Sequence, residues 1–176
     1  MWMIFPSYHN IILPMQHEQR RHPRDFKVGP LQEAWEADRE RVRPYLLRQI
    51  EAAFDGVELG GGVSLHQARA IDDCASDVEI RAARALDTER RWQDVSDKKL
   101  EHLSDTLSMM DAEGFRFYIP RFMTFALRNE GSHSSAGDHA IYWTKAAERN
   151  ENRFGLLSEE QRAAIEDFAD FFSEER

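Results

Sequence analysis

Hydrophobic residues recur at helical spacing along the chain from Leu31 onward. Between Leu31 and Phe54 they are separated by three, four or seven positions, with charged residues between them, which is the pattern of an amphipathic helix. Pro44 interrupts this stretch, so the sequence predicts either a kink or two abutting helices there. A terminal helix is predicted to bury a second stripe, formed by Ile165, Phe168, Ala169 and Phe172. The dominant period predicts a mainly α fold, a single-domain, irregular helical bundle.

Serine residues mark where several of these helices are expected to begin. A serine followed three positions later by Glu or Gln has the spacing of a capping box, in which side chain and backbone satisfy each other's hydrogen bonds. This spacing occurs at Ser76 and at Ser158. Ser64 and Ser96 are predicted N-caps as well. The helix after Ser96 is expected to carry one apolar stripe as far as Met110.

The run D-A-E-G-F-R-F-Y-I-P at residues 111–120 departs from the helical pattern. Gly114 is predicted to end the preceding helix, and Pro120 to stand in the first turn of the next one. The aromatic and aliphatic side chains between them alternate with polar ones, as in a strand. The sequence therefore leaves room for one short extended segment near residues 115–119.

Residues 1–30 differ in composition from the rest of the chain. They contain four of the six prolines and carry a small positive charge, whereas the remainder is acidic. Prolines at this spacing block a long helix, because each lacks an N–H group and disfavours helical geometry in the residue before it. We expect residues 1–30 to form an extended or disordered arm and residues 31–176 to form a helical globular domain.

The composition limits what the protein can do. The 176 residues include 23 Lys and Arg against 32 Asp and Glu, so the net charge is 23 − 32 = −9 with histidines neutral. This balance disfavours binding to nucleic acid or to anionic membranes, and no stretch approaches the length of a membrane span. The single cysteine, Cys74, excludes an internal disulfide and a cysteine-rich zinc site. We predict a cytoplasmic protein with no cofactor and no bound metal, and the oligomeric state is left open.

Four residues of the 111–120 run are candidate catalytic groups: Asp111, Glu113, Arg116 and Tyr118. In the functional interpretation they line a pocket, and the carboxylates act as acid and base or as metal ligands in a small hydrolase or metal-dependent enzyme, with Asp72 or His66 as further candidates. In the structural interpretation the phenylalanines of this region fill the core and Arg116 pairs with Asp111 or Glu113. The second interpretation is favoured, because aromatic residues at this spacing usually belong to a core.

Other polar groups are weaker candidates. The segment 129–139 contains the residue types of a catalytic triad or a zinc site, but lacks the spacing of either, and is expected to be a mobile surface loop. These residues are His133, Ser134, Ser135, Asp138 and His139. Asp72 and Asp73 lack the spacing of a calcium loop. The glycines at 60–62 are expected to form a tight turn, and Cys74 to be a small buried residue.

The terminal helix carries a candidate binding surface. Its exposed side is strongly acidic, with carboxylates at Glu159, Glu160, Glu166, Asp167 and Asp170. Such a face can simply keep a protein soluble. It can also meet a basic protein, because complementary charge accelerates encounter. The leading hypothesis is a non-enzymatic acidic protein-binding module of an immunity, toxin-neutralising or regulatory type with a basic protein partner. Nucleic-acid binding ranks below it, because only residues 1–30 are basic.

Three segments carry a resemblance to a known family. They are L-G-G-G-V-S-L at residues 59–65, D-A-E-G-F-R-F-Y-I-P at residues 111–120, and L-S-E-E-Q-R-A-A-I-E-D-F at residues 157–168. Together they resemble a family of small bacterial proteins of unknown function with a D-x-E-G-F-R-F-Y-[IL]-P motif, over about residues 48–172. The resemblance implies a compact, mostly helical domain and supplies no catalytic assignment.

Overall fold

The structure, a computed structural model, describes residues 28–132, 134–145 and 151–173. The chain divides into two units, residues 1–44 and residues 45–176, and each is described by itself. The described part of the first unit is the beginning of a helix that starts at Val28. The expected N-terminal arm lies outside the described residues as far as residue 27.

The described chain is built from α-helices and short 3₁₀ helices. No strand occurs in residues 28–132, 134–145 or 151–173, so the prediction of a mainly α fold is confirmed. The 3₁₀ helices are η3 (Arg84–Leu86), η4 (Trp92–Asp94) and η5 (Thr106–Met109). The α-helices are α1 (Val28–Ala53), α2 (Leu65–Asp72), α3 (Asp77–Ala83), α4 (Asp97–His102), α5 (Ala112–Arg128), α6 (Ser135–Lys145), α7 (Glu151–Phe154) and α8 (Glu159–Phe171).

Three of the four predicted serine caps are confirmed by side-chain hydrogen bonds, and the fourth, Ser64, stands at the N-cap of α2. At α3, Ser76 Oγ accepts from the Glu79 N–H at 3.4 Å, and the Glu79 carboxylate accepts from the Ser76 N–H at 2.9 Å. Ser158 and Gln161 make the same reciprocal pair at α8. Ser96 caps α4. These caps depend on residues three positions apart, so the sequence alone specifies them.

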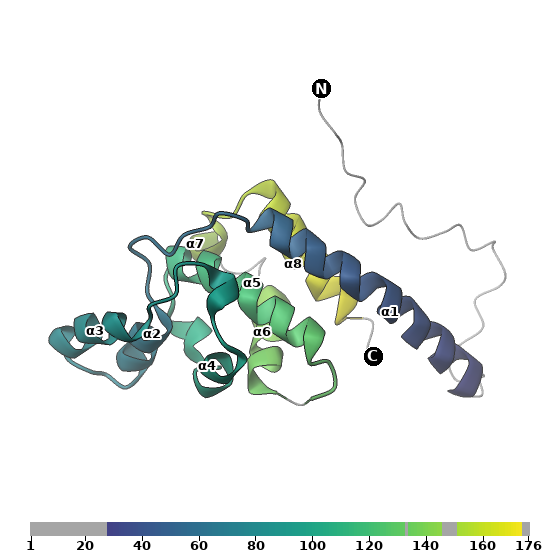
Figure 1. The fold of residues 1–176 in the computed structure, drawn as a ribbon, viewed down its shortest axis with the longest axis horizontal. Coiled ribbons are helices and arrows are strands. Elements are labelled where there is room, and N and C mark those ends of the chain that lie inside the picture. The colour runs from purple at the N-terminus through teal and green to yellow at the C-terminus, as the bar shows by residue number, and fades with distance from the viewer. Residues whose placement is uncertain (1–27, 133, 146–150, 174–176) are drawn as a thin grey trace, which may run out of the picture. The chain divides into compact units, whose positions relative to one another are not determined.

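Helix α5 is the centre of the second unit. Every residue from Phe117 to Leu127 is buried, and α5 contacts α6, α7, η4 and η5 (Figure 1). The expected extended segment near residues 115–119 is therefore wrong, because these residues are helical. Gly114 lies in the first turn of α5 and does not end the preceding helix, and Pro120 lies in the middle of α5. Phe117 points to a different side of the helix from Phe115 and Ile119, and all three are buried, so their alternation with other residues in the sequence does not indicate a strand.

Four other expectations are corrected. Helix α1 is one continuous α-helix through Pro44, so the alternative of two abutting helices is wrong, and that of a kink stays a prediction. The apolar stripe expected after Ser96 is divided between α4 and η5, although its residues are buried as far as Met110. The segment expected to be a loop at 129–139 becomes helical at Ser135. Cys74 is exposed, in a turn with φ 54°, and is not a buried residue.

No helix in the described part of the chain combines the length and the apolar character that crossing a bilayer requires.

Candidate functional site

The start of α5 packs against the glycine-rich loop that precedes α2. Asp111 caps the helix, and its Oδ1 accepts hydrogen bonds from the backbone N–H of Gly114 at 2.8 Å and of Val63 at 2.9 Å. A Cβ on Gly62 would lie 2.5 Å from the backbone nitrogen of Gly114, and a Cβ on Gly114 would lie 2.3 Å from the Val63 carbonyl oxygen. The two backbones therefore meet at a distance that only glycine permits at both positions.

Arg84 holds the same loop from the other side. Its guanidinium donates to the carbonyl oxygens of Gly60, at 2.8 Å, and of Gly62. It also lies 3.2 Å from Gln67 Oε1, which accepts from the Ser64 N–H at the start of α2. The glycine cluster is therefore a turn between helices, as predicted, and two of its backbone carbonyls accept hydrogen bonds from Arg84.

The four candidate catalytic residues do not converge on one site. Glu113 is exposed, with its carboxylate beside Gly61. The Arg116 Nε donates to Gln161 Oε1 of α8 at 3.2 Å, in place of the expected pairing with Asp111 or Glu113. Tyr118 is only 1% exposed, and burial raises the pKa of its hydroxyl, with a further contribution from the negative charge of Asp87. Asp111 is engaged by backbone N–H groups, Arg116 by Gln161, and Tyr118 is buried, so no acid and base face a common substrate position.

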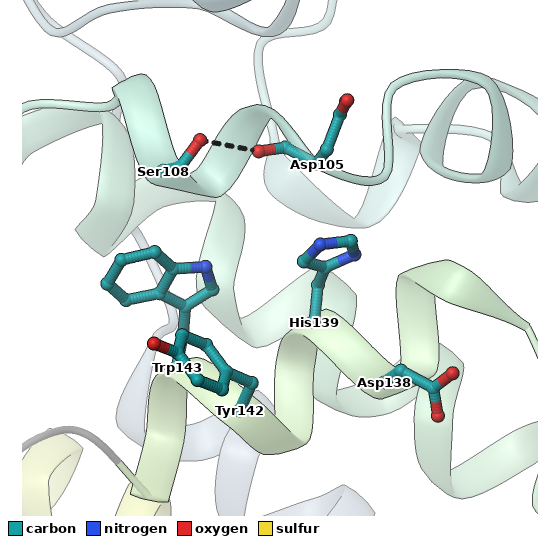
Figure 2. Close-up of a pocket in the computed structure, with 6 residues that line it drawn as sticks. All are labelled: Asp105, Ser108, Asp138, His139, Tyr142 and Trp143. Atoms are coloured by element: carbon teal, nitrogen blue, oxygen red, sulfur yellow. Dashed lines mark hydrogen bonds between the residues drawn. The ribbon is translucent and has the colours of Figure 1, made fainter.

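Two candidates from the 129–139 segment line an open cleft between η5 and α6, shown in Figure 2. The cleft has a volume of about 390 Å³. The His139 Nδ1 lies 2.8 Å from the carbonyl oxygen of Ser135, and His133 lies outside the described residues. No triad is assembled among the described residues, because His139 bonds to the Ser135 backbone and not to a hydroxyl. The lining residues are Asp105, Ser108, Asp138, His139, Tyr142 and Trp143.

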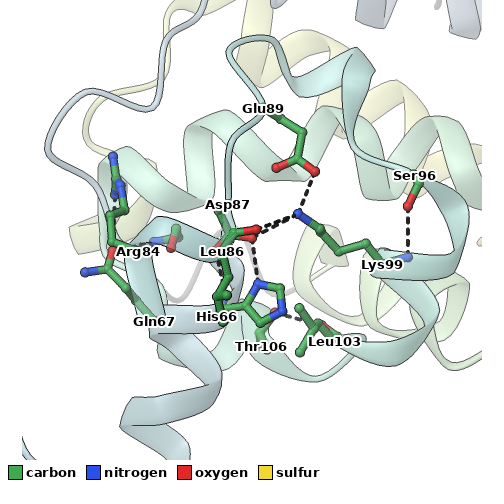
Figure 3. Close-up of polar contacts among 11 residues, drawn as sticks. His66, Gln67, Arg84, Leu86, Asp87, Glu89, Ser96, Lys99, Leu103 and Thr106 are labelled. Carbon is green, nitrogen blue, oxygen red and sulfur yellow. Dashed lines mark hydrogen bonds and ion pairs between the residues drawn. The ribbon is translucent and has the colours of Figure 1, made fainter. Parts of the chain in front are cut away.

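A second polar cluster surrounds a buried carboxylate (Figure 3). The Asp87 side chain is 1% exposed, and its two oxygens lie 2.8 Å from the His66 Nδ1 and 2.8 Å from the His66 backbone nitrogen. The Lys99 Nζ lies 3.2 Å from Asp87 Oδ1 and 2.5 Å from Glu89 Oε1. The cluster joins α2, the segment after η3, and α4.

The hydrogen bonds of this cluster favour its charged forms. Burial by itself would raise the pKa of Asp87, but hydrogen bonds from Ser64 and His66 hold that pKa below its ordinary value. Burial by itself would lower the pKa of Lys99, but Glu89 and Asp87 raise it above its ordinary value. The negative charge of Asp87 and the positive charge of Lys99 therefore stabilise each other at neutral pH.

This cluster supports the fold and shows no catalytic arrangement. Asp87 orients His66 as an acid orients the histidine of a triad, but in the described residues no hydroxyl or thiol is bonded to His66. No group of three or more His, Cys, Asp or Glu in the described part of the chain could hold a metal ion. Sequence reasoning proposed His66 as an accessory group and missed Asp87 and Lys99, because no local spacing connects residues 12 to 21 positions apart.

The carboxylates predicted on α8 share one side of that helix, and we call the set of five the acidic face. Asp167 is half-buried, and its carboxylate accepts a hydrogen bond from the Gln49 Nε2 at 2.7 Å. Hydrogen bonds from its own backbone and from Ser158 hold the pKa of Glu160 below its ordinary value. The other members are exposed. The acidic face consists of Glu159, Glu160, Glu166, Asp167 and Asp170.

Comparison with known proteins places the chain in a family. A family model described as "Family of unknown function (DUF6714)" matches residues 43–176, which is more than half of the chain. Searches of curated proteins and of solved structures gave no match. The chain belongs to this family, whose matched region contains α2 to α8 and all the groups described above.

Proposed function

We propose that this member of the family is a non-enzymatic, acidic protein-binding module of an immunity, toxin-neutralising or regulatory type, and that the acidic face of α8 contacts a basic protein. The observation that carries the proposal is the division of α8 into two sides. One side is buried through residues that include Ile165 and Phe168, and the other carries the five carboxylates.

The spacing of the carboxylates makes the acidic face continuous. Glu159, Glu166 and Asp170 are seven and four positions apart, so they form one row along the helix, and Glu160 and Asp167 form a second row beside it. The helix contains one arginine, Arg162, so its charge is 1 − 5 = −4. The row stands on a helix fixed by its buried side, and a fixed array of like charges suits recognition of a complementary surface.

The net charge of the whole chain adds a long-range effect. A protein of net charge −9 attracts a basic protein before contact, and such steering raises association rates at low salt. The attraction acts over a Debye length of about 8 Å at physiological salt. We therefore expect binding to weaken steeply as salt is added.

The alternative function is a small hydrolase or metal-dependent enzyme that uses Asp111 and Glu113. The geometry at the start of α5 gives it no support, because Asp111 is engaged by two backbone N–H groups and Glu113 lies exposed on the surface. We favour the binding function over this alternative, because it needs only carboxylates held on a fixed helix, and four of the five are exposed.

The test is capture of a partner with two matched variants. A tagged full chain is used as bait in lysate of the source organism, and bound proteins are identified by mass spectrometry. The face variant Glu159→Gln/Glu166→Gln/Asp170→Asn removes three charges from the acidic face. The control variant Asp55→Asn/Glu58→Gln/Asp73→Asn removes three exposed charges elsewhere, so both variants have the net charge −9 + 3 = −6.

We expect a basic protein that is captured by the wild type and the control variant and lost from the face variant. Elution by salt should accompany this result. Loss from both variants alike would show that net charge, and not the acidic face, accounts for the capture. Capture of no basic protein at any salt concentration would contradict the proposed function.

A further inference from the structure

The open cleft between η5 and α6 has walls that are fixed by two arginines of the protein itself. The Arg153 guanidinium donates to the carbonyl oxygens of Leu107, at 3.0 Å, and of Ser108, and it lies 4.5 Å from the centre of the Trp143 ring. Arg69 forms an ion pair with the Oδ1 of Asp105. The carboxylate and the indole are therefore held in place before any ligand arrives, which lowers the entropy cost of binding.

Acceptors outnumber donors among the polar groups of the cleft, where the Trp143 indole N–H and the Tyr142 hydroxyl are the groups that can donate to a ligand. A backbone carbonyl can only accept, so the His139 Nδ1 that bonds to Ser135 carries a hydrogen, and whenever the ring holds no second proton its Nε2 is an acceptor. The Ser108 hydroxyl donates its hydrogen to the Asp105 carbonyl oxygen at 2.8 Å. Among the described residues, the Oδ2 of Asp105 and the carboxylate of Asp138 receive no hydrogen bond or ion pair. The cleft needs a ligand with several donors.

Aromatic rings form one end of the cleft. Tyr142 is 63% exposed, and its ring meets that of Trp143 edge to face with 5.2 Å between centres. Figure 2 shows the two rings together at one end, Asp138 at the other, and His139 pointing from α6 toward Asp105. Such rings attract a cation at their faces, and Trp143 already holds the guanidinium of Arg153.

These features select one chemical group. A guanidinium is planar, carries five donors and stacks on aromatic rings, whereas an ammonium is compact, strongly hydrated and has three donors. An anion would meet two carboxylates. We propose that the cleft lined by Asp105, Asp138, His139 and Tyr142 binds the guanidinium of an arginine side chain on the basic protein partner. The source of the arginine rests on the proposed function, but the cleft can be tested without the partner.

The test is a titration of the full chain, labelled with ¹⁵N, followed by NMR. The probes are N-acetyl-arginine amide, N-acetyl-citrulline amide, which is nearly the same shape but uncharged, and N-acetyl-lysine amide. We expect saturable shifts of the Trp143 indole N–H and of the backbone amides of residues 138–143 with the arginine probe. Affinity for the other two probes should be lower by about tenfold or more, because they lack the charge or the planar donor set.

Two variants locate the binding. Tyr142→Ala and Asp138→Asn change exposed side chains, and each should weaken the arginine probe by several-fold. Asp170→Asn on the acidic face is the matched control and should bind like the wild type. The spectra themselves show whether each variant is folded.

The outcomes separate this proposal from the proposed function. Equal affinity for the citrulline or lysine probe, shifts that do not saturate, or unchanged affinity in both cleft variants would overturn the arginine site. Arginine binding in the cleft together with no captured partner would leave the site established and the proposed function contradicted. A captured basic partner together with no response to the arginine probe would support the proposed function and overturn the arginine site.

Discussion

Gly114→Ala is expected to destabilise the protein, although alanine is the better helix former. Gly114 is the third residue of α5, where the Val63 carbonyl crosses the helix. A Cβ at this position would lie 2.3 Å from that oxygen and 3.0 Å from Asp111 Oδ1, so the loop or the helix must move. Either movement disturbs the two hydrogen bonds that Asp111 accepts from Val63 and Gly114.

The magnitude follows from three contributions. Forcing a methyl group into a filled space costs about 1–3 kcal/mol. A weakened hydrogen bond to a charged group costs about 1.5–3 kcal/mol. The gain in helix propensity offsets up to about 1 kcal/mol of this cost. We therefore expect a net loss of about 1.5–5 kcal/mol in the free energy of unfolding. Each kcal/mol lost lowers the melting temperature by roughly 2–4 °C.

Gly137→Ala is the matched control. Gly137 is the third residue of α6, and a Cβ there would lie 3.8 Å from Ala126, which is an ordinary contact. This variant should gain up to about 1 kcal/mol. Urea unfolding followed by circular dichroism measures both variants, and the midpoints should move in opposite directions with unchanged slope. Equal stabilisation of the two variants would refute the close approach of the loop to α5.

The remaining predictions concern two other groups. Because the pKa of Asp87 is lowered in the folded state, its charge stabilises the fold above the unfolded pKa of about 4, and this contribution is lost as pH falls through the lowered value. Asp87→Asn should lower the free energy of unfolding by about 1–3 kcal/mol at pH 7. Below pH 5 the free energy of unfolding should fall less steeply for this variant than for the wild type. Urea unfolding measures both pH profiles, and parallel profiles would contradict the prediction. The exposed Cys74 should react with one equivalent of a thiol reagent such as DTNB in the folded protein, at a rate close to that of a small-molecule thiol. A Cys74 that reacts only after the protein unfolds would instead lie in the interior.

Local sequence signals predicted the parts of the fold that depend on neighbours in the chain. Ser76 with Glu79 and Ser158 with Gln161 satisfy one another within a single turn, so spacing alone locates those helix starts. The α5 region shows the limit of this reasoning. Its aromatic alternation favoured a strand, but the alternating residues are buried against neighbours on different sides of a helix, which local sequence does not reveal.

The polar sites depend on contacts between distant parts of the chain. Arg116 bonds to Gln161, 45 positions away, and His66 bonds to Asp87, 21 positions away. Nothing in the local sequence around Arg116 distinguishes this amide partner from the nearer carboxylates. The acidic face is different, because one helix supplies all its members, and the sequence was sufficient to predict their common side.

The most direct test of the proposed function is the association rate constant of the captured basic partner, measured over a series of salt concentrations for the wild type, the face variant and the control variant. At low salt we predict that the face variant associates about tenfold or more slowly than the control variant, although the two have the same net charge, and that this difference shrinks as salt is added. Equal association rates for the two variants at every salt concentration would contradict a binding role for the acidic face of α8.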